Sequence, residues 1–290
     1  MRIAITATPS LYRPGPLLLW GDLAGAFRQA AELGIQGVEI HFRHADDLDP
    51  QAVKRLMAEY GLAVPTLGTG MAVGDGLSLC DPRPEIRAQT VERVRGHIEV
   101  AAEIGSAVTI GTLSGKLGNS APAERTTRRA QALECLAEVY RSAQRAGVTV
   151  FLEALNRYEC DYINTLADVR KVVAEIGATN MKLLADTFHM NIEEVDLVAS
   201  LKAAAPLLGH VHLADTNRQA PGHGHLDVAA ILRALAEIDY RGYLSFEVFP
   251  LPDAGTAIRD GIAAVRAAAP GIPAQEDPLP ATAEPKAKVA

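Results

Sequence analysis

Short apolar segments alternate along this chain with longer segments in which apolar residues recur at helical spacing. The short segments are rich in Val, Ile, Leu and Phe, which is typical of β-strands, and the longer ones predict amphipathic α-helices. The predicted strands span 2–6, 37–42, 63–69, 107–112, 148–155, 181–186, 209–215 and 243–249. The predicted helices span 22–34, 50–60, 84–104, 122–146, 165–176, 193–204, 226–238 and 255–268.

Eight strand-then-helix units predict an α/β protein. Nearly continuous apolar strands indicate a parallel sheet covered by helices on its outer face and filled with side chains on its inner face. Eight units in one chain of this length favour a single-domain (β/α)8 TIM barrel over an open sheet. The first strand is not followed by the glycine fingerprint of dinucleotide-binding folds. We expect the barrel to occupy residues 1–269 and the Pro- and Ala-rich tail, 270–290, to be disordered.

The composition narrows the function classes. Of the 290 residues, 48% are hydrophobic and 22% charged, and the net charge is −7, which argues against a nucleic-acid-binding protein. The sequence contains neither an apolar run long enough to span a bilayer nor a segment resembling a secretory signal. Its three cysteines form no Cys-x-x-Cys pair. We therefore expect a cytoplasmic protein without a membrane partner.

Ionisable residues lie at or near the ends of the last four predicted strands. Glu153, Asp186, His212 and Glu247 belong to successive strands, and Asp215 follows His212 closely. The carboxyl ends of TIM-barrel strands form the active site, so these side chains are expected to meet there. Carboxylates brought so close together repel one another, and burial destabilises their charged forms. A divalent cation would remove both effects, and oxygen ligands with one imidazole suit Mn²⁺, Mg²⁺ or Co²⁺.

Each of these residues also has an ordinary structural interpretation. A glutamate in an apolar strand is often ion-paired, and a histidine in a strand is often a hydrogen-bonded core residue. Their alignment on four consecutive strands favours a shared function, because buried acids without compensation are strongly destabilising. Glu39, in the second predicted strand, either hydrogen-bonds within the barrel mouth or forms an ordinary buried ion pair.

Four segments of the second half resemble the sugar isomerase and epimerase family with a xylose-isomerase-like TIM barrel. They are EALNRYECDYINT, ADTFHMNIEE, HVHLADTNRQAPGHGHLD and FEVFPLP, at 153–165, 185–194, 210–227 and 246–252. The chain is similar to ketose 3-epimerases of the D-tagatose and D-allulose type and to 5-keto-L-gluconate epimerases. The segment at 67–87 and the Pro-Leu-Pro that follows Phe249 look more like the keto-sugar-acid group.

The resemblance implies roles for individual residues. The family's metal ligands fall on the four strand-end positions already identified, and two of them, Glu153 and Glu247, would act as the catalytic bases. The family's substrate-binding residues fall on Glu159, His189 and Arg218, with His189 in the loop that follows Asp186. From the sequence alone, Arg218 could equally be a surface loop cation, Glu159 a surface acid and His189 a capping or packing residue.

The resemblance implies a metal-dependent enzyme, with Mn²⁺ as the first expectation and Mg²⁺ or Co²⁺ as alternatives. The expected reaction is epimerisation next to the ketone of a keto-sugar or keto-sugar acid such as 5-keto-L-gluconate or D-tagaturonate. The alternatives are a D-tagatose- or D-allulose-type ketose 3-epimerase, an aldose–ketose or hydroxypyruvate-type isomerase, a metal-dependent lyase or endonuclease, and a non-catalytic sugar-binding protein. Family members form homodimers or homotetramers, so either assembly is expected.

Overall fold

The computed structural model describes residues 1–12 and 15–268. Within them, eight parallel strands close into a barrel, because β1 pairs with β9 as well as with β3. These strands are β1 (Arg2–Thr8), β3 (Gly37–His41), β4 (Thr66–Gly68), β5 (Ala107–Ile110), β6 (Val150–Glu153), β7 (Met181–Asp186), β8 (Leu208–His212) and β9 (Tyr243–Phe246). A short strand, β2 (Leu19–Trp20), pairs with the end of β1 beyond the part that contacts β9.

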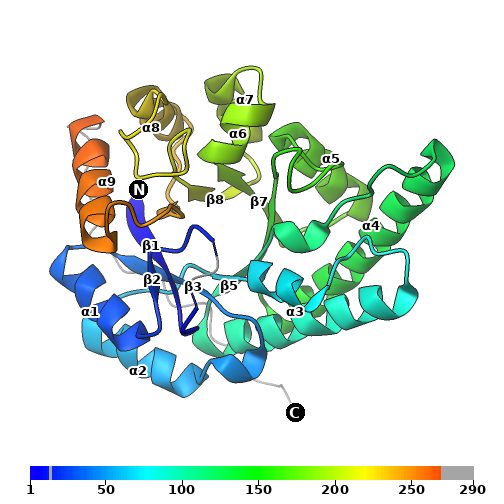
Figure 1. Ribbon diagram of the computed structural model, residues 1–290, viewed down its shortest axis with the longest axis horizontal. Helices are drawn as coiled ribbons and strands as arrows, with labels where there is room; N and C mark the ends of the chain where they lie inside the picture. The colour runs from blue at the N-terminus through cyan, green and yellow to red at the C-terminus, as the bar shows by residue number, and fades with distance from the viewer. Residues whose placement is uncertain (13–14, 269–290) are drawn as a thin grey trace, which may run out of the picture.

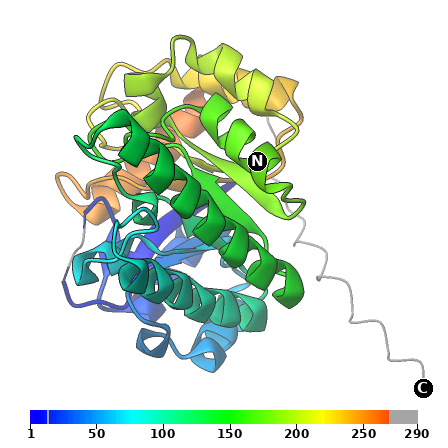
Figure 2. The same cartoon turned by 90° about the vertical axis from the view of Figure 1, so that its right-hand side faces the viewer.

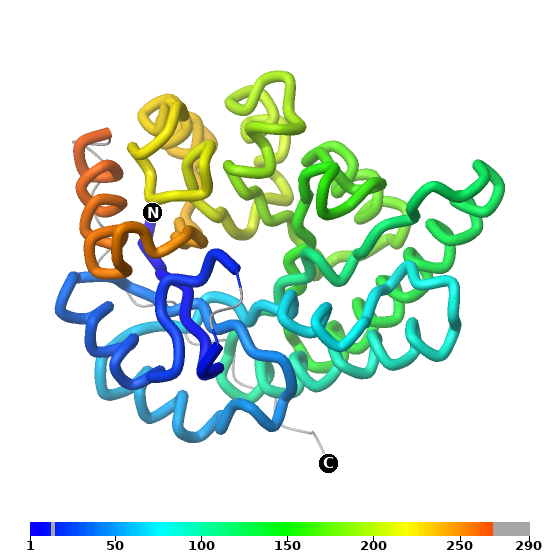
Figure 3. Tube along the Cα trace, in the orientation of Figure 1, coloured from blue at the N-terminus to red at the C-terminus, as the bar shows by residue number. Residues whose placement is uncertain are grey.

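Helices surround the barrel, and the chain passes around it in sequence order (Figures 1 and 3). They are α1 (Leu23–Glu32), α2 (Pro50–Tyr60), α3 (Pro84–Ile104), α4 (Pro122–Ala146), α5 (Leu166–Ile176), α6 (Thr187–Glu193), α7 (Leu197–Ala204), α8 (Val228–Glu237) and α9 (Ala254–Ala268). In the described part of the chain, three short 3₁₀ helices lie in loops: η1 (Ala45–Asp47), η2 (Gly70–Asp75) and η3 (Thr112–Ser114). The long helices α3 and α4 lie side by side (Figure 2).

Local sequence signals fix where these helices begin and end. Helix α3 begins with Pro84, and proline is well tolerated there because the first backbone N–H groups of a helix have no partner within the helix. The helix ends at Gly105, which takes the left-handed conformation (φ 73°). Helix α5 begins with a capping box, in which Thr165 and Asp168 bond each other's backbone N–H groups. Such signals explain why the predicted bounds of α2, α3 and α4 match the structure.

The structure confirms the predicted (β/α)8 barrel and corrects details of it. The predicted helix 193–204 is wrong, because the structure has two helices, α6 and α7, with a break between them. Asp186 accepts a bond from the Phe188 N–H and so caps α6 directly after β7, while Asp196 caps α7 by accepting from Ala199. The short strand β2 was not predicted. The predicted tail, 270–290, lies outside the described residues.

None of the helices in the described part of the chain is both long enough and apolar enough to cross a membrane.

Packing of α9 on the barrel predicts a measurable effect on stability. Phe246, at the end of β9, is fully buried, and a methyl group added at Gly261 would lie 2.8 Å from the Phe246 ring. Gly261→Ala should therefore lower the free energy of unfolding by on the order of 1 kcal/mol, because overpacking of about 1–3 kcal/mol outweighs the helix propensity gained. Urea denaturation measures the change.

Gly255→Ala is the matched control on the same helix. Its new methyl group would meet mainly the flexible end of Arg259, at 3.2 Å, rather than a buried ring. This variant should be as stable as the wild type or slightly more stable. If Gly261→Ala proved equally stable, the close packing of α9 on Phe246 would be contradicted.

Candidate active site

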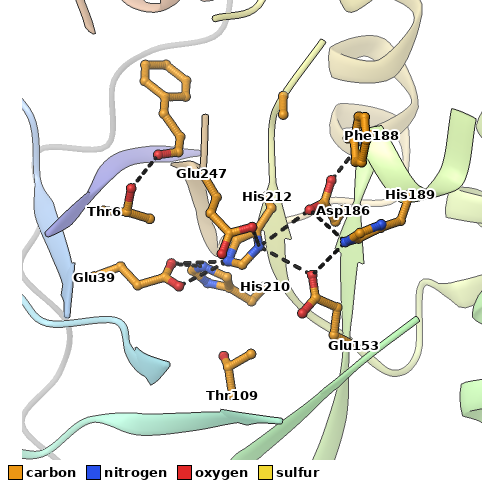
Figure 4. A network of polar contacts seen from close by, with 12 residues as sticks. Thr6, Glu39, Thr109, Glu153, Asp186, Phe188, His189, His210, His212 and Glu247 are labelled. Atoms are coloured by element: carbon orange, nitrogen blue, oxygen red, sulfur yellow. Dashed lines mark hydrogen bonds and ion pairs between the residues drawn. The ribbon is translucent and has the colours of Figure 1, made fainter. Parts of the chain in front are cut away.

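The four predicted ligand residues come together at the carboxyl end of the barrel. Glu153, Asp186 and His212 are the last residues of β6, β7 and β8, and Glu247 directly follows β9. Strand pairing sets Asp186 opposite His212. One ligand atom from each of the four side chains lies within 4.8 Å of the others, and Figure 4 shows them pointing toward one another. We call these four residues the cage.

The cage contains polar atoms with no hydrogen-bond partner. His212 Nδ1 lies 3.4 Å from Glu247 Oε2, 3.5 Å from Glu153 Oε1 and 3.8 Å from Asp186 Oδ2. Both His212 Nδ1 and Glu153 Oε1 are buried and make no hydrogen bond. Unpaired buried groups are costly, and here they face one another across a gap. Three carboxylates and one imidazole therefore fit a divalent cation, which would pair with all four.

Burial and neighbouring charges move the pKa values of the cage acids in different directions. Burial raises the pKa of Glu153 above its ordinary value, and the charge of Glu247 adds to the rise, although His212 opposes it. Burial also acts to raise the pKa of Glu247, but His212 and Arg218 outweigh it and lower the value to about 2. For Asp186, His189 and Arg218 outweigh burial in the same way and hold the pKa below its usual range.

The acids of the site in turn raise the pKa values of its two basic groups, His212 and Arg218. Burial acts to lower the pKa of His212, but Glu39 and Glu247 outweigh it and raise the value well above that of an ordinary histidine. Arg218 lies against Asp186 and Glu247, and these acids keep its pKa raised despite burial. The raised pKa of His212 reflects the negative charge around it, and Arg218, which is permanently charged, balances part of that charge. This reduces the repulsion between the three buried carboxyl groups.

His189 lies on α6, so its predicted place in a loop is wrong. The capping of α6 by Asp186 explains the difference, because it starts the helix immediately after β7. The ring is buried, and its Nε2 lies 3.6 Å from Asp186 Oδ2 and 3.9 Å from Glu153 Oε1. Its Nδ1 accepts from the backbone N–H of Asn156 at 3.3 Å. The edge of the His189 ring that carries Nε2 therefore points toward the cage.

Arg218 is buried beside the cage, which excludes its interpretation as a surface loop cation. Its Nη2 donates to Asp186 Oδ2 at 3.2 Å and to Glu247, and its guanidinium lies 4.7 Å over the Phe188 ring. Its backbone takes the left-handed conformation (φ 57°), which is strained for a residue with a long side chain. The loop after β8 therefore places this arginine at the cage against its local conformational preference.

Glu159 lies at the edge of the same site and is partly exposed. Its Oε1 accepts from Asn156 Nδ2 at 3.0 Å and lies 4.0 Å from His189 Nδ1. Asn156 is thus a site residue that was not predicted: it is buried and contacts two of the three predicted substrate-binding residues, Glu159 and His189. Its position directly after the apolar run that ends at Leu155 was the available signal. Asp215, by contrast, accepts backbone N–H groups of its own loop and is not part of the cage.

A cavity of about 500 Å³ opens above the cage. Glu153, Glu159, His189, His212, Arg218 and Glu247 line it. Its other walls include Arg43, Met71, Thr112, Phe188 and Phe249. This volume and mixture of apolar and polar walls are typical of a small-molecule site.

The sequence profile of the xylose isomerase-like TIM barrel family matches residues 27–268, so the chain belongs to this family. Among curated relatives, an L-ribulose 3-epimerase of Mesorhizobium japonicum is 32% identical over 79% of this chain and 76% of its own length. A 3-dehydro-D-guloside 4-epimerase of Escherichia coli is 32% identical over 83% of this chain and 92% of its own length. The predicted family is confirmed, and the protein is an enzyme of the sugar epimerase and isomerase type.

Solved structures agree with this assignment. The E. coli 3-keto-D-glucoside 4-epimerase, in its apo form, superposes with a TM-score of 0.78 at 28% identity, covering 92% of this chain and all of that one. The D-allulose 3-epimerase of Methylomonas sp., crystallised with D-allulose, gives a TM-score of 0.73 at 28% identity, covering 91% of this chain and 90% of that one. Each relative is named for an activity on a keto-sugar.

The cage geometry predicts binding of one divalent ion per chain. Addition of Mn²⁺ should raise the melting temperature of the wild type, because an ion that binds only the folded state stabilises it. Asp186→Asn removes a charged ligand and should abolish most of this shift. Differential scanning fluorimetry with and without Mn²⁺ measures it.

Glu193→Gln is the control for this measurement. Glu193 lies on the same helix as His189, and its carboxylate bonds Arg157 rather than the cage. The variant should keep the full Mn²⁺-dependent shift. An undiminished shift in Asp186→Asn would contradict the cage as the ion site.

Proposed function

We propose that the protein is a divalent-metal-dependent epimerase that inverts the carbon next to the ketone of a keto-sugar or keto-sugar acid. The observation that carries this proposal is the cage of three acids and one histidine at the base of a sugar-sized cavity. We infer 5-keto-L-gluconate or D-tagaturonate as the first substrates to test and Mn²⁺ as the first ion, with Mg²⁺ and Co²⁺ as alternatives. A cytoplasmic homodimer or homotetramer stays the expected form.

The reaction requires removal of a weakly acidic proton and its return to the opposite face. A divalent ion held by Glu153, Asp186, His212 and Glu247 would supply Lewis acidity that stabilises negative charge on the substrate oxygens. Glu153 and Glu247 come from different strands, β6 and β9, and their oxygens lie 3.5 and 3.4 Å from His212 Nδ1, which suits two separate bases acting on a planar enediolate. The pKa values of these two carboxyls are shifted in opposite directions, a pattern that favours an acid and a base in the same site.

Three further residues are suited to hold the sugar. Arg218 is permanently charged and presents a fork of N–H donors to substrate oxygens. His189 turns Nε2 toward the cage, where it can donate to a hydroxyl or carbonyl oxygen. Glu159, partly exposed at the cavity wall, can accept from a substrate hydroxyl. Together they would keep the reacting carbon between the two carboxyls and limit rotation of the substrate.

The names of the relatives support the same class of reaction. A ribulose carries its ketone at carbon 2 and is inverted at carbon 3, and a 3-dehydro sugar carries its ketone at carbon 3 and is inverted at carbon 4. In both, the inverted carbon neighbours the ketone. The runner-up functions are a ketose 3-epimerase acting on neutral sugars, to which the relatives' names point, and an aldose–ketose or hydroxypyruvate-type isomerase using the same acids.

Isotope exchange tests the reaction. Turnover in D₂O with Mn²⁺ should place deuterium on the carbon that is inverted, while the carbonyl stays where it was. Glu247→Gln should lower kcat by roughly 10²–10⁴-fold, the range for loss of a general acid–base group, and Glu193→Gln should not change it. Mass spectrometry and NMR of the product read both the label and the configuration.

Different outcomes separate the competing functions. Movement of the carbonyl would replace the epimerase with an isomerase. Tight binding of keto-sugars with no turnover by the wild type would indicate a non-catalytic binding protein. A panel of 5-keto-L-gluconate, D-tagaturonate, D-fructose, D-allulose and hydroxypyruvate covers the candidate substrates.

Arg43 offers a test of whether the substrate is an acid. It lines the cavity, and its Nη1 lies 3.6 Å from an oxygen of Asp75. Asp75 pairs more closely with Arg93, whose Nη1 lies 2.7 Å from its other oxygen. The charge of Arg43 is therefore available to a substrate carboxylate. Arg43→Gln should raise KM for keto-sugar acids roughly 10-fold or more, since hydrogen bonds to charged groups contribute about 1.5–3 kcal/mol. KM for neutral ketoses should change little.

Steady-state kinetics on one acid and one neutral ketose make this comparison. Arg55→Gln, an exposed arginine on α2, serves as the control. An equal rise in KM for both substrates, or no rise for the acid, would contradict recognition of a carboxylate by Arg43.

A further inference from the structure

Glu39 is a fully buried acid that none of the roles above uses. It lies in the middle of β3, on the barrel interior, and its carboxylate contacts three imidazoles. Glu39 Oε1 lies 2.8 Å from His41 Nε2 and 3.1 Å from His212 Nε2, and Oε2 lies 3.0 Å from His210 Nε2. Figure 4 shows Glu39 on the side of His212 opposite Glu153. Glu39, His41 and His210 thus form a layer of side chains directly beneath His212 of the cage.

The direction of these hydrogen bonds follows from the chemistry of the groups. An ionised carboxylate can only accept, so each of the three Nε2 atoms must carry a proton and donate it. The three imidazole nitrogens that lie within 3.1 Å of the Glu39 oxygens are all able to donate, which suits the ionised form of Glu39. A neutral imidazole that carries its proton on Nε2 has a free lone pair on Nδ1. In His212 that atom faces the three cage acids.

We propose that Glu39 is the positioning residue of the metal site: it holds His212 in the tautomer and orientation that direct the Nδ1 lone pair into the cage. The proposal rests on the proposed function only through the binding of a divalent ion by the cage. Glu39 contacts neither the ion position nor the cavity, so it acts through His212. Partners of this kind fix the ring of a ligand histidine and raise its basicity.

The surroundings of Glu39 make this a rigid arrangement. The His210 ring stacks on Phe151, with centroids 5.4 Å apart and planes at 16°, and meets the His212 ring edge to face at 5.4 Å. The His41 ring packs against Gly68 so closely that a methyl group added at Gly68 would lie 2.2 Å from the ring. Both histidines are thus fixed by packing, and they hold the Glu39 carboxylate against His212. Rotation of His212 would break its bond to Glu39 and bring its carbon edge toward the cage.

Glu39, His210 and His212 could also be interpreted as ligands of a second ion, since one atom of each lies within 4.8 Å of the others. The observed distances favour direct hydrogen bonds, because carboxylate and imidazole atoms at 3.0–3.1 Å are within bonding reach of one another. A positioning role predicts one ion per chain and a second site predicts two. Stoichiometry therefore separates the two interpretations.

The test is titration of the metal-free full chain with Mn²⁺ alone, by isothermal calorimetry, for the wild type, Glu39→Gln and His210→Gln. The amide of Glu39→Gln keeps the shape of the side chain but turns one acceptor into a donor facing N–H groups. We expect one ion per wild-type chain, affinity lowered about 10–100-fold in Glu39→Gln, the range for loss of such partners, and near wild-type affinity in His210→Gln. His210→Gln is the matched control because it changes the same network without removing the acceptor of His212.

A second measurement needs no variant. Long-range ¹H–¹⁵N NMR of the wild type with Mg²⁺ should show His212 protonated at Nε2 and not at Nδ1. Protonation at Nδ1, unchanged Mn²⁺ affinity in Glu39→Gln, equal losses in both variants, or two ions per chain would each overturn the role of Glu39. Absence of any Mn²⁺ binding by the wild type would instead overturn the cage as a metal site, and the role of Glu39 with it.

Discussion

The structure of this site depends on how three buried carboxyl groups are kept within a few ångströms of one another. Their mutual repulsion and the loss of water both disfavour the charged forms. Arg218 provides positive charge that the protein itself contributes. The orphaned Nδ1 of His212 and Oε1 of Glu153 mark the position where a cation is still needed. A divalent ion satisfies this requirement and turns an unfavourable cluster into a binding site. The proposed chemistry follows from the same requirement.

The barrel makes this arrangement possible because its parallel strands all end at one face. Each cage acid comes from the end of its own strand, so backbone hydrogen bonds in the sheet fix the distances between the ligand atoms. One layer further in, Glu39 and the histidines of β3 and β8 fill the barrel interior with hydrogen bonds in place of apolar side chains. The loops beyond the strand ends add Arg218 and Glu159 at the cavity wall. Rigid ligands and adaptable loops are a combination that lets one fold serve many substrates.

The barrel and the four cage positions could be predicted from the sequence, because apolar runs that end in an acid or a histidine recur on consecutive strands. The bounds of β7 were predicted correctly for the same reason. The burial of Arg218 could not be predicted, since its loop contains the usual polar turn residues and only tertiary contacts with Asp186 reveal its place. Helix α6 was missed because it is short and its start depends on the Asp186 cap. Two of the three partners of Glu39, His210 and His212, lie 171 and 173 residues away along the chain, beyond the reach of local patterns.

Crystallography of the protein with bound Mn²⁺ shows directly whether the four cage residues hold a divalent ion. Anomalous diffraction near the manganese edge locates the ion independently of any kinetic assay. We expect a single strong peak per chain, bonded to His212 Nδ1 and to oxygens of Glu153, Asp186 and Glu247, at roughly 2.0–2.4 Å as for other hard divalent cations. A peak bonded to other residues, or no peak in crystals saturated with Mn²⁺, would contradict it.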